Sequence, residues 1–468
     1  MKKFFIVALL IFTTSVLSAQ KHYAVTYEQL KEYEGVYEYF NHAVIKIAAS
    51  PVDTILYGII NQSSYALRPV DKDVVVNNLG QRTRFLRNSM HVITGYVTGK
   101  DSFKLITKNI SFPQQMWYPR SPADLVNYHY KYTIPPALND GLPTGDAAKA
   151  GLDTALLAAM MDKIVTAKYL NVHSVLIIKD GKLVFEEYFY NYGRDSLQEQ
   201  RSATKSAISA LTGIAIHQGY IKSVNERVLA YFPEYHLNNN SELKQKITVK
   251  DLLSNQSGLN YDEAYDKAVG NENTMSYTDD WVKYTLDLPM LDTPGTRGRY
   301  ASGNPITMAR IIEKATHMPL HDFALKNLYR PMGITNFKWN FTPDKRGAEN
   351  YGEVFLRPRD MAKFGLLYLN NGVWDKQQLV PAEWVKESTS KQSVVQGVDY
   401  GYLWWLKYLD ADGGVRYNSF AAQGNGGQKI YVFKQQQLVV VITGGNYNTQ
   451  SPSNELVKKY ILPAFNKH

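Results

Sequence analysis

The alternation of apolar and polar positions divides the chain into a β-rich part and a longer mixed part. From residue 24 to about 112, short runs rich in Val, Ile and Tyr are separated by turn residues, as in HAVIKIAAS, TILYGII and HVITGYVTG. Such runs are typical of strands. They predict a small β-rich N-terminal domain over residues 20–112, either an open barrel or a sandwich. Residues 113–150 contain many prolines and predict an irregular linker.

The rest of the chain, residues 151–468, predicts a hairpin and a helix near each end around a helical middle. Residues 173–190 contain two apolar runs joined at Asp180-Gly181, a dipeptide typical of tight hairpin turns. The segment QKIYVFKQQQLVVVITGGN predicts a second hairpin. The expected fold class is α/β (α+β). An antiparallel sheet built from both ends is flanked by helices and accompanied by an all-helical region.

The first residues, MKKFFIVALLIFTTSVLSAQ, have the pattern of a cleaved secretory leader. Lys2 and Lys3 form its basic end, an apolar run follows, and LSA before Gln20 is a small-residue cleavage site. Because the apolar run is short for a membrane span, we expect a signal peptide over residues 1–19 that is removed. The mature chain is then periplasmic or secreted, without stable membrane insertion.

Composition and charge narrow the classes of function. The 468 residues are 44% hydrophobic and 20% charged, as in a folded globular protein. The net charge of +9 is spread along the chain without a long basic run, which argues against nucleic-acid binding. The chain has no cysteine, so thiol nucleophiles and cysteine-bound metals are excluded. His317 and His321 lack an acidic third ligand at a characteristic spacing, so neither a metal nor a cofactor is expected.

The pattern Ser-x-x-Lys occurs four times, and the copy at Ser202 differs from the others by its context. The copies at Ser241 and Ser388 lie in polar stretches, and the copy at Ser18 spans the predicted cleavage site. Ser202 instead begins a long apolar helical pattern. Residues three apart share a helix face, so the Ser202 hydroxyl and the Lys205 amine can meet.

The chemistry of this pair follows from burial. An apolar setting disfavours a charged amine. A neutral amine beside a hydroxyl can take its proton, which is the arrangement of nucleophilic catalysis. The alternative interpretation is that Ser202 caps the helix while Lys205 is a surface charge.

Two later segments add to this hypothesis. Tyr300-Ala-Ser302 lies in the Gly/Pro-rich loop PGTRGRYASGNP, directly before a helical pattern. In AAQGNGGQKIYV, Gly424 and Gly426 come just before the second predicted hairpin. A backbone without side chains lets a ligand approach closely, and a free N–H there can point at an oxyanion. The alternative is a plain glycine loop.

In combination these motifs resemble those of the serine β-lactamase and penicillin-binding-protein superfamily. They are most similar to its class C-like branch of esterases, D-aminopeptidases and 6-aminohexanoate-oligomer hydrolases. The order SATK, then YAS, then AQGNGGQ carries the resemblance, which covers about residues 150–468. It implies a serine hydrolase that cleaves a small ester, amide or peptide substrate through an acyl-enzyme.

The resemblance also implies a role for each motif residue. Ser202 would be the acylated nucleophile and Lys205 its proton acceptor, while Tyr300 would carry the proton to the leaving group. Ser302 would hold Lys205 and the substrate by hydrogen bonds. The oxyanion hole would combine the backbone N–H of Ser202 with one near Asn425. The substrate-binding strand would contribute Gly424, Asn425 and Gly426.

Two departures from the family pattern bear on the substrate. The third triplet, Ala422-Gln423-Gly424, lacks the cation that recognises a substrate carboxylate in β-lactamases, and Ser302 stands where asparagine is common. Both favour small esters or amides. The first alternative is a D-amino-acid peptidase or β-lactamase-type amidase acting on peptidoglycan fragments or β-lactams. The second is a non-catalytic binding protein on the same fold. The sequence leaves the oligomeric state open.

Overall fold

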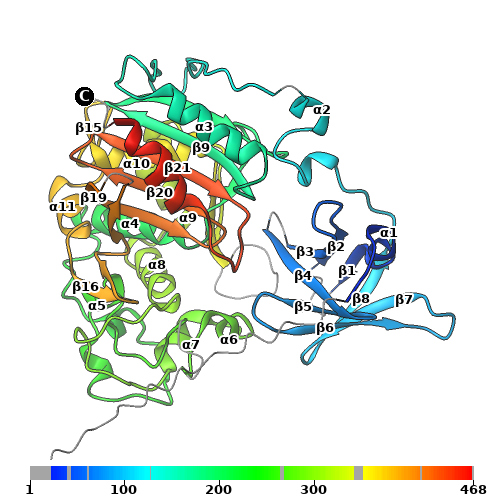
Figure 1. The fold of residues 1–468 in the computed structure, drawn as a ribbon. Helices are drawn as coiled ribbons and strands as arrows, with labels where there is room; N and C mark the ends of the chain where they lie inside the picture. The colour runs from blue at the N-terminus through cyan, green and yellow to red at the C-terminus, as the bar shows by residue number, and fades with distance from the viewer. Residues whose placement is uncertain are drawn as a thin grey trace, which may run out of the picture.

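The computed structural model describes most of the chain, in these stretches: residues 23–38, 44–60, 63–126, 128–263, 268–341, 351–411 and 414–465. The predicted signal peptide, residues 1–19, lies outside the described residues. Figure 1 shows two bodies side by side, a β-barrel and a larger body of sheet and helices.

The N-terminal body is a closed barrel of eight antiparallel strands in sequence order. The β-rich prediction is confirmed, but the open barrel or sandwich is wrong, because β1 pairs with β8 as well as with β2. Closure leaves no free strand edge. A short helix, α1 (Tyr27–Leu30), precedes the strands, which are β1 (Gly35–Glu38), β2 (Val44–Ala49), β3 (Leu56–Ile60), β4 (Ser63–Asp71), β5 (Val74–Asn77), β6 (Arg82–Arg87), β7 (Ile93–Thr98) and β8 (Asp101–Thr107).

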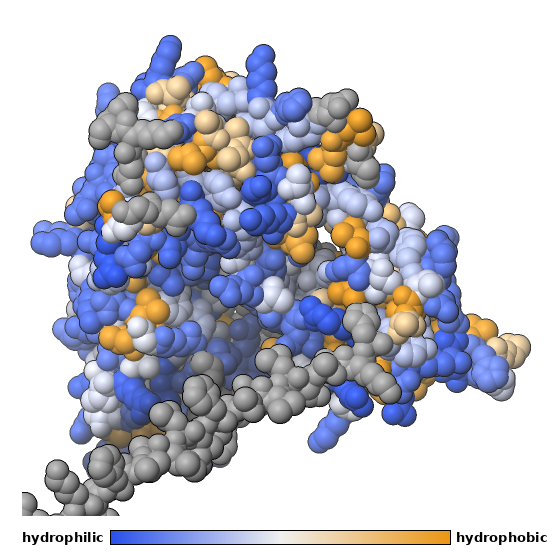
Figure 2. Space-filling view, in the orientation of Figure 1, coloured by the Kyte–Doolittle hydropathy of each residue, from blue (hydrophilic) through white to orange (hydrophobic). Residues whose placement is uncertain are grey.

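Side chains fill the interior of the barrel. Tyr37, Phe85 and Tyr96 are buried there, and their ring centroids lie 5.0 to 6.2 Å apart. Such contacts between aromatic rings stabilise a small core beyond the area they bury. The face of the molecule in view is mostly hydrophilic, and its apolar residues are scattered (Figure 2).

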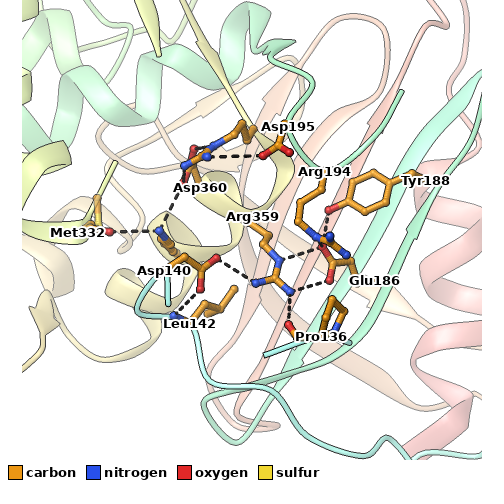
Figure 3. A network of polar contacts seen from close by, with 12 residues as sticks. Pro136, Asp140, Leu142, Glu186, Tyr188, Arg194, Asp195, Met332, Arg359 and Asp360 are labelled. Carbon is orange, nitrogen blue, oxygen red and sulfur yellow. Dashed lines mark hydrogen bonds and ion pairs between the residues drawn. The ribbon is translucent and has the colours of Figure 1, made fainter. Parts of the chain in front are cut away.

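A proline-rich segment with little regular structure joins the barrel to the main body. In the described part of this segment, the one α-helix is α2 (Pro122–Leu125). The segment is fixed to the main body by Arg359, whose guanidinium donates to Asp140 Oδ2 at 2.9 Å and to Pro136 O at 2.8 Å. Arg359 also binds both carboxylate oxygens of Glu186, at 2.9 and 2.7 Å (Figure 3). This bidentate, buried arrangement is the strong form of an arginine–carboxylate contact.

The main sheet has eight antiparallel strands in the order β10-β9-β21-β20-β19-β18-β17-β16. Both predicted hairpins lie in it, and β9 pairs with β21, so the two ends of the main body build one sheet as expected. Asp180 and Gly181 form the predicted turn with φ of 50° and 77°. The strands are β9 (Val172–Lys179), β10 (Lys182–Tyr188), β16 (Ser393–Val395), β17 (Val398–Tyr400), β18 (Trp405–Asp410), β19 (Arg416–Gly424), β20 (Gln428–Phe433) and β21 (Leu438–Gly444).

Helices cover both faces of this sheet. Alternate residues of β21 point to opposite faces, with Val439 and Val441 in one core and Val440 and Ile442 in the other. One face packs against α3 (Thr154–Val165) and the C-terminal segment with α12 (Ser453–Leu456). The other packs against α4 (Thr204–His217) and α10 (Pro358–Leu369).

A helical region lies below the sheet in Figure 1. Its helices are α5 (Val249–Leu253), α6 (Glu272–Ser276), α7 (Trp281–Asp287) and α8 (Gly303–Thr316). Two more helices, α9 (Leu320–Ala324) and α11 (Ala382–Ser388), lie at the height of the sheet in that view. Two small sheets complete the body: β11 (Gln198–Glu199), β13 (Tyr351–Leu356) and β12 (Lys338–Phe341) in one, β14 (Val373–Trp374) and β15 (Gln377–Gln378) in the other. Among the described helices, none is both long and apolar enough to cross a bilayer.

Helix α4 runs through the core and begins at the predicted site. Every residue from Thr204 to Ala215 is buried. Gly213 is needed there because a Cβ at this position would lie 2.3 Å from the ring of Trp384. The apolar pattern that predicted this helix therefore reflects packing on all of its sides.

A buried histidine on β9 makes the fold sensitive to acid. The His173 ring stacks on Tyr192 with centroids 3.8 Å apart, and its Nδ1 lies 3.2 Å from Gln198 Oε1. Burial lowers the pKa of His173 to about 3. In an unfolded chain the pKa of histidine is about 6.5, so between these two values the unfolded state binds a proton that the folded state does not. Stability must fall as the pH falls through this window.

We predict that His173→Gln flattens the acid limb of the stability curve. The parent should lose up to about 1.4 kcal/mol of unfolding free energy per pH unit through this one group between about pH 6 and pH 4. Urea unfolding across that range measures the slope. The exposed His236 gives the matched control, His236→Gln. Parallel slopes for the parent and His173→Gln would contradict the prediction.

Candidate active site

The predicted pair forms at the start of α4. Ser202 lies in the 3-10 turn Arg201–Ala203 that leads into the helix, and Lys205 lies in the first helical turn. Lys205 Nζ is 2.7 Å from Ser202 Oγ. Lys205 is only 9% exposed, and Ser202 makes no capping hydrogen bond. The alternative of a helix cap beside a surface lysine is therefore wrong.

The charge state of Lys205 differs from the expectation. Burial lowers its pKa, but the Tyr300 phenol and nearby carboxylates raise it, and the net direction is upward. The expectation of a neutral amine is wrong, because it rested on the apolar helix alone and left out the acidic side chains around Lys205. The acidic side chains come from other segments of the chain, namely Glu272, Glu353 and Glu263. At rest, the site holds a charged lysine that donates to the serine oxygen.

Tyr300 and Ser302 lie beside this pair at the start of α8. The centre of the Tyr300 ring is 5.3 Å from Lys205 Nζ and 5.5 Å from the Trp405 ring. Ser302 is buried, and its hydroxyl donates to Glu272 Oε2 at 3.1 Å. The expected bond from Ser302 to Lys205 is not formed among the described residues. Ser302 instead binds one of the carboxylates that raise the pKa of Lys205.

The glycine segment between β19 and β20 packs against the turn that carries the serine. A Cβ on Gly424 would lie 2.2 Å from the carbonyl oxygen of Gln200, so only glycine fits there. Asn425 Oδ1 accepts from the N–H groups of Gly426 and Asn448, both at 2.9 Å, which fixes the loop. The backbone N–H of Asn425 donates to no other residue in the described part of the chain.

All three motifs open onto one cleft of about 360 Å³. Ser202, Tyr300 and the segment from Gly424 to Gly427 line it. The structure thus brings together residues that lie more than two hundred positions apart in the sequence. Across the described chain, no group of three or more acidic or histidine side chains is arranged to hold a metal.

A family comparison agrees with this arrangement. The family model described as Beta-lactamase matches residues 157–457, which include the three motifs. The chain belongs to the beta-lactamase family of serine hydrolases. The predicted resemblance to the serine β-lactamase and penicillin-binding-protein superfamily is confirmed.

Solved structures of this family share the fold. A family VIII carboxylesterase superposes with a TM-score of 0.53 and 16% identity over 69% of this chain and 98% of that one. A penicillin-binding protein homolog from Caulobacter crescentus superposes with a TM-score of 0.51 and 14% identity, over 69% of this chain and 99% of that one. Protein flp from Staphylococcus aureus strain MRSA252 is 26% identical over 38% of this chain. The match spans only 37% of the length of protein flp.

Several cleft residues outside the three motifs were not singled out in the sequence. They come from loops and strand ends that fold together: Glu263, Gln396, Lys429, Thr449 and Ser451. Lys429 matters most, because it places a cation beside the third motif. Its Nζ donates to Gln423 Oε1 at 2.7 Å across the β19–β20 pair, and burial lowers its pKa to about 7. A charged residue inside the apolar run QKIYVF was the available signal.

We predict that Glu272→Gln lowers the pKa of Lys205, because it removes a carboxylate that stabilises the ammonium. Glutamine keeps an oxygen for the Ser302 hydroxyl, so the local hydrogen bond survives. The measurement is an NMR titration of the Lys205 side chain, assigned through Lys205→Arg.

The control for this titration is Glu234→Gln, since Glu234 pairs with Lys314 on the surface. The Lys205 midpoint should move to lower pH in Glu272→Gln and stay in place in the control. An unmoved midpoint in both would show that Glu272 does not set the charge of Lys205.

Proposed function

We propose that this protein is an exported serine hydrolase that cleaves a small ester or amide through an acyl-enzyme on Ser202. The observation that carries the proposal is the 2.7 Å contact between Lys205 Nζ and Ser202 Oγ on the wall of an open cleft. Export rests on the leader pattern of residues 1–19.

Acylation begins with attack of Ser202 Oγ on the substrate carbonyl. The Oγ–carbon bond forms while the hydroxyl proton passes to the deprotonated amine of Lys205. Because the pKa of Lys205 is raised, this form is minor at neutral pH, but it is a strong base once formed. Tyr300, close to the same amine, delivers the proton to the leaving group as the carbonyl–leaving-group bond breaks.

The developing oxyanion is stabilised by two backbone N–H groups. Ser202 lies in the first turn at the start of a helix, where the N–H groups have no partner within the helix. Asn425, whose backbone N–H has no partner among the described residues, lines the same cleft. Donors fixed before the reaction cost no reorganisation during it. Water then attacks the acyl carbon, the bond from that carbon to Ser202 Oγ breaks, and a proton of the water passes to Oγ, which releases the acid and restores the serine.

Small, uncharged acyl groups fit the charge of the cleft best. The triplet Ala422-Gln423-Gly424 has no cation, and Lys429 is held by Gln423 with a lowered pKa. The fold neighbour that is a carboxylesterase supports esters as the first class to test. The second candidate is a D-amino-acid peptidase or β-lactamase-type amidase on peptidoglycan fragments or β-lactams. Lys429 favours it, because this cation lies in the cleft and can meet a substrate carboxylate when protonated.

We predict that the parent hydrolyses p-nitrophenyl acetate with a burst and gains one acetyl group, whereas Ser202→Ala does neither. Loss of the nucleophile should slow hydrolysis by about a thousandfold or more. Stopped-flow absorbance and intact mass at early times are the measurements.

Ser241→Ala is the matched control, since Ser241 heads another Ser-x-x-Lys copy in a polar, exposed loop. The control should retain the burst and the adduct. Hydrolysis by Ser202→Ala at the rate of the parent would contradict the proposal.

A further inference from the structure

Strand β4 of the barrel reaches the turn that carries Ser202. Ser63 Oγ donates to Glu199 Oε2 at 2.6 Å. Tyr65 Oη accepts from Arg201 Nη2 at 3.2 Å. Both partners lie within three residues of Ser202. The barrel therefore makes two side-chain hydrogen bonds to the segment that leads into the candidate nucleophile.

The backbone of that segment is held in an unfavourable conformation. Arg201, directly before Ser202, has a φ of 47°, in the left-handed region. A non-glycine residue stays there only where its surroundings hold it. Contacts of the Arg201 guanidinium stabilise this conformation. Its Nη1 lies 3.1 Å from Glu199 and 3.3 Å from Glu353, and its Nη2 donates to Tyr65 Oη.

The same contacts extend to the glycine loop, which lines the cleft together with Ser202. The ring of Tyr65 packs on Tyr447 with centroids 5.5 Å apart, and the Arg201 guanidinium lies 5.8 Å from the centre of the Tyr447 ring. Tyr447 in turn abuts Gly426, where a Cβ would lie 2.6 Å from Tyr447 Cε1. Tyr65 thus joins the serine turn and the glycine loop through two neighbouring side chains.

A second contact joins the barrel to the helical region. Tyr277, which follows α6, donates to Asp101 Oδ2 on β8 at 3.1 Å. Helix α6 begins with Glu272, one of the carboxylates around Lys205. The barrel therefore contacts both the turn that carries Ser202 and the segment directly after α6.

We propose that the barrel is a positioning element of the active site, and that Tyr65 is its main positioning residue. Tyr65 and Ser63 hold Arg201 and Glu199 so that Ser202 faces the N–H groups of the glycine loop. This inference rests on the proposed function. Neither Tyr65 nor Ser63 lines the cleft, so both act through the serine turn and not by touching the substrate.

The test is the rate of acylation by p-nitrophenyl acetate in full-length Tyr65→Phe. This variant removes one hydroxyl and keeps the ring on Tyr447. A misplaced nucleophile should slow acylation by about ten- to a hundredfold with little change in KM, because substrate contacts stay intact. Tyr57→Phe is the control, since Tyr57 is a barrel tyrosine whose hydroxyl donates to Asp53 at 2.6 Å, away from the cleft. The control should acylate like the parent.

A double variant shows whether Tyr65 acts through Arg201. In an Arg201→Lys background, Tyr65→Phe should cause no further loss, because residues that act through one another are not additive. Equal fractional losses in both backgrounds would overturn the proposal. Ser63→Ala, which removes the other contact, should also slow acylation. If Tyr65→Phe lowers the thermal midpoint, its slower acylation could come from lost stability, and Ser63→Ala then provides the test. An unchanged acylation rate in Ser63→Ala would overturn the proposal.

The outcomes separate this inference from the proposed function. A parent that forms no acetyl adduct on Ser202 would defeat the proposed function itself. A parent that forms the adduct at the same rate as Tyr65→Phe would defeat only the positioning role of the barrel.

Discussion

A buried ammonium within hydrogen-bonding distance of a serine is the constraint on which the rest of this structure depends. Burying a cation is costly unless acidic partners compensate for the water it loses. Lys205 has acidic neighbours in Glu272, Glu353 and Glu263, which come from separate segments and raise its pKa, while burial raises the pKa of Glu353 and Glu263 themselves. These acids need donors of their own, and Ser302 and Arg201 supply hydrogen bonds to them. One lysine therefore explains why distant elements converge at the start of α4.

The sequence predicts features that depend on local spacing. The Asp180-Gly181 turn, the helix from Thr204 and the meeting of Ser202 with Lys205 all follow from residues at most four apart. The order of the three motifs indicated the superfamily, and the family comparison confirms it. The sheet built from both ends was predictable because each hairpin has a clear apolar pattern.

Closure of the barrel and the charge of Lys205 depend on residues far apart in the chain and were not predicted. Closure of the barrel requires β1 to pair with β8, and no local pattern specifies that partner. The raised pKa of Lys205 was missed for the same reason, since its acidic neighbours follow no motif. Lys429 was also missed. Lys429 adds a titratable amine to the cleft beside a triplet that lacks a cation. Whether the substrate carries a carboxylate therefore has to be decided by experiment.

The most direct test of this account is to label the protein with a fluorophosphonate and to locate the adduct by peptide mass. Such a probe reacts with an activated serine and marks it covalently. A single adduct per chain is expected, on the peptide that contains Ser202. An adduct on any other residue in the parent, with Ser202 unmodified, would contradict the assignment of the nucleophile on which the mechanism depends.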